Sequence, residues 1–219
     1  LGIGGIAIAM AAKDTIANIF GSLTVVTDRP FSIGDWVKIN DVEGTVEHLG
    51  FRSTRIRTFY NSLVSVPNSV LLTASVDNLG ERHYRRFKTM LSVTYDTSVE
   101  SLEAFTAGIR ELIALHTNTR KDNYIVRLNE FSASSLDILL YVFFETPTWE
   151  AELLVREQLM LDIIRLAQKL NVEFAFPTQT VHLNQDSTTL SKMASFDAVQ
   201  KNISKGQKVA NTIVQTYRK

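Results

Sequence analysis

Residues 1–12 have the sequence LGIGGIAIAMAA and carry no charge, and the first charged side chains are the adjacent pair Lys13 and Asp14. A membrane-spanning helix needs about 20 apolar residues, so this stretch is long enough to span only if the helix begins before Leu1. Glycine costs about 1 kcal/mol relative to alanine inside a helix, and the glycines here therefore need a reason in packing. Two interpretations of residues 1–12 are therefore possible, a core helix buried within a soluble protein and a helix that lies in a membrane.

A helical wheel places the apolar and the small residues of this stretch on separate faces. Ile3, Ile6, Met10 and Lys13 form one narrow stripe, and small residues flank it on both sides. Small flanks let neighbouring helices approach closely in a membrane, and such helices suit a closed ring of copies around a lumen. We therefore predict a ring-forming helix with Lys13 where the lumen meets water. The predicted helix-packing residues are Gly2, Gly5, Ala9 and Ala12. A soluble pair of helices remains the alternative.

A second helix is expected from Thr15 to Thr27, with Asp14 as its N-cap. Its apolar side chains recur at the helical spacing i, i+3, i+4, i+7, at Ile16, Ile19, Phe20 and Leu23. Pro30 disfavours a helical conformation at the residue before it and ends the helix. The charged pair at its start predicts a kink, with the second helix lying at a membrane interface.

Between Phe31 and Gly80 the apolar pattern changes to a period of two, which is typical of strands. Asn40–Asp41 and Tyr60–Ser62 supply turn residues between them. Four or five short strands in about 45 residues predict a small all-β barrel of Sm or SH3 type. The expected strands are Trp36–Ile39, Gly44–Glu47, Thr54–Phe59 and Leu63–Val66.

The following section alternates strands and helices in the order β-α-β-β-α-β, which is the ferredoxin-like plan. A last strand, Glu173–Leu183, is interrupted by Pro177, which suits a sheet edge. Residues 184–219 are polar and basic with weak periodicity, and we expect a mobile tail. The preceding elements are expected at Arg85–Tyr95, Ser98–His116, Tyr124–Phe131, Leu136–Glu145 and Trp149–Leu170.

Composition and motifs argue against an enzyme. The 23 basic and 23 acidic side chains cancel, and the absence of cysteine excludes cysteine-ligated zinc, iron–sulfur clusters and thiol nucleophiles. Ser132–Ser135 lacks the context of a nucleophile elbow and is interpreted as a turn. No glycine-rich phosphate loop follows a strand. Catalytic residues, cofactors and metals are not expected. The four histidines are scattered at positions 48, 83, 116 and 182.

Several motifs, in order along the chain, together resemble the bacterial small-conductance mechanosensitive channel family. They cover Leu1 to about Asn184 and are Gly4–Asn18, Asp28–Trp36 followed by Gly44–Val46, Val66–Ser69, Leu128–Ser135 and Phe174–Pro177. The resemblance implies a homoheptamer in the bacterial inner membrane, with at least two further spanning helices before Leu1. It further implies a cytoplasmic vestibule, closed by a small barrel of C-terminal strands.

Transferred residue by residue, the family's two apolar constriction rings correspond to Ile6 and Met10, and Asn18 corresponds to the asparagine of its kinked helix. Lys13 replaces a neutral polar residue, as in a lysine-bearing subgroup of lower conductance. Asp14 stands where some members have a kink glycine. The implied partners are other copies of the chain, membrane lipids, and permeating ions and small solutes, without nucleic acid.

The expected division of the chain follows from these segments. Residues 1–29 form the pore-lining and kinked interfacial helix, 30–80 the Sm-like domain, 81–178 the ferredoxin-like domain, 179–184 the barrel strand and 185–219 the polar tail.

Two other functions are open at this point. A soluble RNA-binding module would use Arg52, Arg55, Arg57, Phe59 and Tyr60, but it leaves the glycine–alanine helix unexplained. A membrane scaffold would assemble as a ring without conducting ions.

Overall fold

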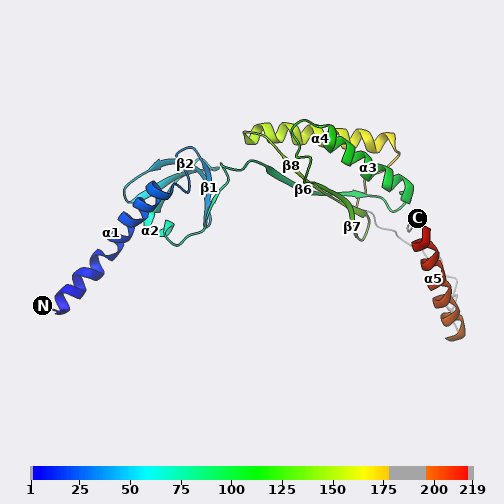
Figure 1. The fold of residues 1–219 in the computed structure, drawn as a ribbon, viewed down its shortest axis with the longest axis horizontal. Coiled ribbons are helices and arrows are strands. Elements are labelled where there is room, and N and C mark those ends of the chain that lie inside the picture. The colour runs from blue at the N-terminus through cyan, green and yellow to red at the C-terminus, as the bar shows by residue number, and fades with distance from the viewer. Residues whose placement is uncertain (1, 178–195, 217–219) are drawn as a thin grey trace, which may run out of the picture. The chain divides into compact units, whose positions relative to one another are not determined.

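The structure, a computed structural model, describes residues 2–177 and 196–216 of the chain (Figure 1). The chain divides into two compact units, Leu1–Pro177 and Thr178–Lys219. The first contains a long N-terminal helix, a five-stranded sheet, and a three-stranded sheet with two helices. This order of helix, small β domain and α/β domain agrees with the predicted fold class.

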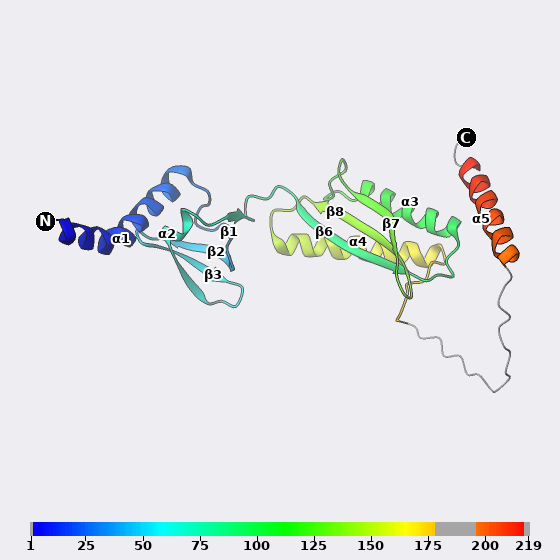
Figure 2. The same cartoon turned by 90° about the horizontal axis from the view of Figure 1, so that it is seen from below.

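The N-terminal helix α1 runs without interruption over Gly2–Asp28. The predicted second helix capped by Asp14 is therefore wrong, because an N-cap has a non-helical backbone and Asp14 lies inside α1. The axis of α1 nevertheless changes direction within its length (Figure 2). Asn18 Nδ2 donates to the carbonyl oxygen of Asp14 at 2.9 Å, and side-chain bonds to the carbonyl four residues earlier favour bending.

α1 ends where Pro30 predicts. Arg29 follows the last helical residue with a φ of 46°, a left-handed conformation that costs a residue other than glycine roughly 1 kcal/mol. Its N–H still donates to the carbonyl oxygen of Val25 at 3.1 Å. The chain thus leaves the helix sharply and enters the β domain.

The β domain is an antiparallel sheet in the order β4-β3-β2-β1-β5. Its strands are β1 (Trp36–Ile39), β2 (Val42–Leu49), β3 (Ser53–Thr58), β4 (Leu63–Pro67) and β5 (Val76–Asn78). The sequence analysis located the first four and missed both β5 and the short helix α2 (Asn68–Leu71). Val25 of α1 and Phe31 close the core together with inward-facing side chains of the sheet, namely Val37, Ile39, Val46, Ile56 and Val66.

The α/β domain has a three-stranded sheet in the order β6-β8-β7. Every second residue of the central strand β8 is buried, and α3 and α4 cover that side of the sheet (Figure 1). Ser98 and Thr148 cap the two helices by accepting the N–H groups of Ser101 and Ala151. The elements are β6 (Arg85–Val93), α3 (Val99–Leu115), β7 (Ile125–Phe131), β8 (Leu136–Phe144) and α4 (Trp149–Lys169).

Only residues 173–177 of the predicted last strand lie among the described residues. Among residues 173–177 only Phe174 forms a β-bridge, with Val93, supported by the bonds Thr94 N to Glu173 O at 3.0 Å and Ala175 N to Ser92 O at 2.9 Å. Pro177 lacks the N–H that would continue the ladder. The predicted barrel strand at 179–184 lies outside the described residues.

The described part of the second unit is a helix, α5, at Phe196–Thr216. The sequence analysis expected a mobile polar tail here and did not predict this helix. Residues 184–219 contain many polar residues, and averaged over this whole stretch the helical spacing of the apolar positions of α5 is hard to recognise.

Candidate functional site

α1 is long and apolar enough to cross a membrane over Gly4–Asp28, judged by length and composition, and only 6% of its most apolar window is buried. Ile6, Ile8 and Met10 are 63%, 73% and 74% exposed in the single subunit. Among the described residues, the first half of this helix therefore presents bare apolar side chains for which water is a poor solvent.

The predicted pore residues all lie on this half of α1. Lys13 and Asp14 are exposed and adjacent at its middle, and Gly2 is the first described helical residue. A Cβ added at Gly5 would have no atom within 4 Å. Ala9 is exposed and Ala12 half-buried. Among the described residues, no contact within the subunit accounts for Gly4 or Gly5.

The second half of α1 packs in the opposite sense to a helix of a water-soluble protein. The face that it turns to the β domain contains the small and polar residues Asn18, Gly21 and Ser22, which lie against α2, and one apolar side chain, Val25, which is buried in the core of the β domain. Other apolar side chains of this half remain exposed by 40–58%, at Ile16, Ile19, Phe20 and Leu23. Soluble amphipathic helices bury the apolar face and expose the polar one, so this inversion favours an apolar environment around α1.

Asn68 is the centre of the junction between α1 and the β domain. Its side chain is almost completely buried, at 1% exposure. Asn68 Oδ1 accepts the Thr54 hydroxyl at 3.0 Å, and Nδ2 donates to Ser22 Oγ at 2.7 Å and to the carbonyl oxygen of Gly50 at 2.8 Å. Both polar atoms of this buried amide thus have partners, as a stable buried polar group requires.

Gly21 allows the two helices to touch. A Cβ at this position would lie 2.0 Å from the carbonyl oxygen of Asn68, a distance that no side chain can adopt without moving one of the helices. Asn18 then completes the contact, because its Oδ1 accepts the N–H of Ser69 at 2.9 Å. We name the set Asn18, Gly21, Ser22, Asn68 and Ser69 the α1–α2 junction.

Sequence reasoning identified Asn18 but missed the other members of the α1–α2 junction. The signals were present, since Gly21 is a glycine within a helix and Val66–Ser69 is one of the motifs of the resemblance. Their pairing was not predictable, because the partners lie 46 and 51 residues apart in the chain.

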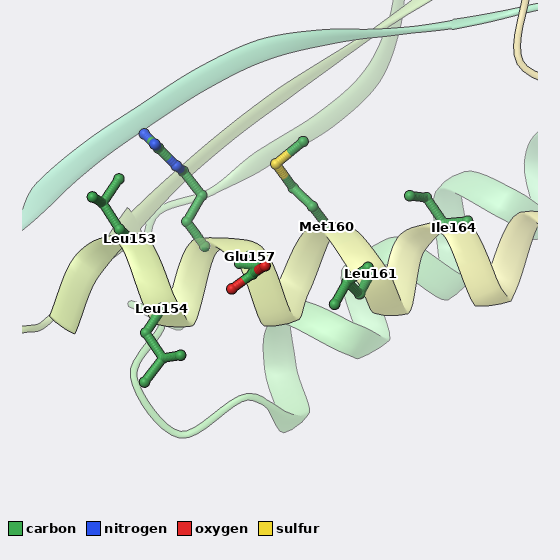
Figure 3. A pocket seen from close by; sticks show the side chains of 7 residues that line it. Leu153, Leu154, Glu157, Met160, Leu161 and Ile164 are labelled. Atoms are coloured by element: carbon green, nitrogen blue, oxygen red, sulfur yellow. The ribbon is translucent and has the colours of Figure 1, made fainter. Parts of the chain in front are cut away.

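The α/β domain carries an apolar hollow on α4 of about 540 Å³ (Figure 3). Leu153 and Leu154 project from the helix in opposite directions in this view, and Leu154 and Leu161 are about half exposed. Arg156 and Glu157 are the ionisable groups among its lining residues. The described residues hold no group of three or more His, Cys, Asp or Glu that could bind a metal ion. The hollow therefore resembles a packing surface more than a catalytic site.

Comparison with known proteins identifies the chain. Residues 14–81 match the family described as mechanosensitive ion channel, beta-domain, and residues 87–174 match mechanosensitive ion channel MscS, C-terminal. The small-conductance mechanosensitive channel MscMJ of Methanocaldococcus jannaschii is 38% identical over 187 residues, 85% of this chain and 53% of its own length. The low conductance mechanosensitive channel YnaI of Escherichia coli is 37% identical over 186 residues, 84% of this chain and 54% of its own length.

Solved structures agree with these matches. The closed-state crystal structure of MscS from Helicobacter pylori has a TM-score of 0.71 and 25% identity, covering 85% of this chain and 72% of that chain. MSL1 of Arabidopsis thaliana has a TM-score of 0.74 at 23% identity over 81% of this chain and 64% of that chain, and so shares the fold. The chain spans about half the length of the curated relatives it matches. Channels of this family are oligomeric membrane proteins, and the chain belongs to the MscS family of mechanosensitive ion channels.

Proposed function

We propose that this chain is the pore-lining and cytoplasmic part of a channel that membrane tension opens, releasing ions and small solutes during hypo-osmotic shock. Seven copies would assemble in the bacterial inner membrane, with the β and α/β domains in the cytoplasm. The observation that carries the proposal is the inverted packing of α1, whose polar face is buried on α2 while its apolar face is bare. Lipid and neighbouring copies of α1 would cover that apolar face.

The gate would consist of the two rings formed by Ile6 and Met10. Both side chains are exposed in the subunit and lie on one stripe of α1. A narrow apolar neck does not hold a continuous column of water, so the resting pore would be closed by dewetting. Tension favours the conformer with the larger area in the membrane, and tilting of α1 would widen the neck by shifting a two-state equilibrium.

The small residues would let neighbouring copies of α1 slide past one another. Gly2, Gly5, Ala9 and Ala12 are the packing residues in this proposal, and the open space around Gly5 in one subunit supports it. Substitution by bulky residues would favour one of the two states. Lys13 and Asp14 would follow at the exit of the neck, where water solvates their charges.

The bent second half of α1, around Asn18, would lie at the interface between lipid and water. The contact of Asn18 with Ser69 and of Ser22 with Asn68 supports the proposal that the β domain fixes the lower end of the pore helix. Movement of α1 would then be resisted by buried hydrogen bonds.

The decisive experiment is patch-clamp recording of the complete protein in bacterial spheroplasts that lack other such channels. Met10→Ser hydrates the proposed neck and is expected to open at clearly lower suction than the unsubstituted channel. Ile8→Ser is the matched control, because Ile8 is equally exposed in the subunit but lies on the opposite side of the helical wheel.

Three results would contradict the proposal in different ways. If both serine variants open at the same suction as the unsubstituted channel, Met10 does not form the gate. A threshold lowered equally by both variants would show general helix destabilisation. Silent patches with assembled rings in the membrane would favour the non-conducting scaffold.

A further inference from the structure

α5 carries a seven-residue repeat whose apolar positions are exposed between residues 200 and 215. Writing the positions of the repeat as a to g, every b, c and f position between residues 200 and 215 is polar, and these are Lys201, Ser204, Lys205, Lys208, Asn211, Thr212 and Gln215. The a and d positions are Ile203, Gly206, Ala210 and Ile213, and in sequence the same 3-4 spacing extends back to Val199 and Phe196. A repeat of this kind is typical of helices that supercoil around one another.

The a and d side chains have no partner within the described part of the chain. All residues from 200 to 215 are exposed, and Ile203 and Ile213 are 49% and 52% exposed. In proteins most of the stability of a helix comes from packing its amphipathic face against a partner and not from intrinsic helix propensity. The apolar face of α5 therefore requires a partner.

Gly206 gives independent support for close approach by another helix. Glycine destabilises a helix by about 1 kcal/mol, and a Cβ at Gly206 would have no atom within 4 Å. Among the residues that the structure describes, neither a turn nor a contact explains this glycine. At a d position, next to the small Ala210, it would allow the backbone of a neighbouring helix to come near.

Two further features favour other copies of α5 as the partner. Val209 and Val214 lie at g and e positions, on the two sides of the a/d seam, so the apolar face is widened toward both neighbours, as a ring of helices needs. A helix lying on a membrane surface commonly carries Trp, Phe or Leu on its apolar face, and α5 has one such residue in line with the seam, Phe196 at its first position, while the apolar positions between residues 200 and 215 are Ile, Val, Ala and Gly.

We propose that α5 is a self-assembly helix, and that the copies of α5 in one channel form a parallel bundle through the seam Ile203, Gly206, Ala210 and Ile213. This inference rests on the proposed ring, which brings one α5 per subunit to a local concentration on the order of millimolar. The Lys side chains at positions 201, 205 and 208 lie on the outer surface of the bundle, where water solvates them.

The absence of cysteine from these 219 residues allows a direct test. In the complete protein, with any cysteine outside this segment replaced, Ile213→Cys places a thiol in the seam and Gln215→Cys places one at an f position. Both positions are exposed in the single subunit, so a difference requires a partner. Treatment of membranes with a short bis-maleimide is expected to give linked dimers and larger species from Ile213→Cys, and at least tenfold less from Gln215→Cys.

A second pair of variants tests the energetics without breaking the helix, since glutamine is a good helix former. Ile203→Gln with Ile213→Gln is expected to weaken the oligomer in detergent, measured by native mass. Lys201→Gln with Lys208→Gln, on the outer face, is expected to leave it unchanged.

The outcomes separate this inference from the proposed function. Equal linking at positions 213 and 215, or a fluorophore at 213 quenched by nitroxide lipids in anionic vesicles, would overturn the bundle. If the same preparation still shows tension-gated currents, the proposed channel function holds although the bundle does not. A monomeric native mass of the unsubstituted protein would instead overturn the ring, and the bundle with it.

Discussion

Asn18 joins the long helix to the β domain with both ends of its side-chain amide. Its Oδ1 accepts the N–H of Ser69 at 2.9 Å, and its Nδ2 donates to the carbonyl oxygen of Asp14 at 2.9 Å. The same residue thus favours the bend of α1 and fixes the helix to α2.

Asn18→Ala removes both hydrogen bonds and leaves the Ser69 N–H unpaired. A net loss of about 1–2 kcal/mol in unfolding free energy is expected, since each bond contributes about 1 kcal/mol. Thermal unfolding in detergent, followed by tryptophan fluorescence, measures the change. Thr24→Ala is the control, because the Thr24 hydroxyl donates only to Phe20 within its own helix. Equal losses for the two variants would contradict the role of Asn18.

Gly21→Ala places a methyl group 2.0 Å from the carbonyl oxygen of Asn68. The helices have to separate, and a destabilisation of about 2 kcal/mol or more is expected from overpacking. Gly4→Ala makes the same change in the same helix with no atom within 4 Å, and is expected to be neutral or mildly stabilising. An unchanged melting temperature for Gly21→Ala would show that the close contact of α1 and α2 is absent.

Glu152→Gln removes the carboxylate facing a buried guanidinium. Arg85 is 6% exposed, its Nη1 lies 3.9 Å from Glu152 Oε2, and this atom has no hydrogen-bond partner in the described chain. Leaving such a charge unpaired typically costs about 3 kcal/mol, so a similar loss of unfolding free energy is expected. Glu150→Gln is the control for the charge at the helix N-terminus, because Glu150 is exposed and lies two residues before Glu152 in the same first turn of α4. Comparable effects of both variants in urea unfolding would contradict the pairing.

The hydrogen bonds of the Asp137 carboxyl, in the turn between β7 and β8, are expected to make the stability of the α/β domain sensitive to acid. Hydrogen bonds from Ser132, Ser92 and Ser135 hold the pKa of its carboxyl below the usual value, with Ser132 Oγ at 2.6 Å and Ser135 Oγ at 2.8 Å. Because the folded pKa is the lower one, this stabilisation is complete above the unfolded pKa of about 3.9 and is lost as pH falls through the folded pKa.

The unfolding free energy is therefore expected to fall below about pH 4. Ser132→Ala brings the folded pKa of Asp137 closer to the unfolded one, so it is expected to lower the unfolding free energy at neutral pH and to make the fall in acid smaller. Urea unfolding over a pH series measures it. Ser134→Ala, in the same turn, is the matched control, since the hydrogen bonds that lower the pKa of Asp137 come from Ser132, Ser92 and Ser135. A pH profile that is identical for the two variants would contradict the assignment.

Lys13→Gln tests the charge at the proposed pore exit. Seven lysines at this level would raise the local anion concentration, with Asp14 offsetting part of the effect. The variant is expected to shift the reversal potential in a salt gradient toward cations. Lys38→Gln, in β1, removes an exposed lysine elsewhere. If the reversal potential of Lys13→Gln does not change, Lys13 has no role in selectivity and instead extends its side chain to the lipid headgroups.

The sequence alone determined the kind and order of most elements, the exceptions being the unbroken α1 and the unpredicted α2, β5 and α5. Alternation at a period of two identified β1 to β4 and the sheet of the α/β domain, and helical spacing identified α3 and α4 to within a residue or two of their bounds. These patterns are local, because a strand or helix buries one face whatever its partner is. The apolar, glycine-rich start of α1 and the ordered motifs of the family were equally readable in the chain.

Only the tertiary structure decided how α1 is held. Asp14 has the residue type of an N-cap, yet the helix continues through it, and Asn18 is hydrogen-bonded to Ser69, which lies 51 positions further along the chain. Gly21 and Asn68 meet because two backbones come into contact there. A sequence records which groups can donate, accept or make room, but distant partners are chosen by the packing of the whole fold.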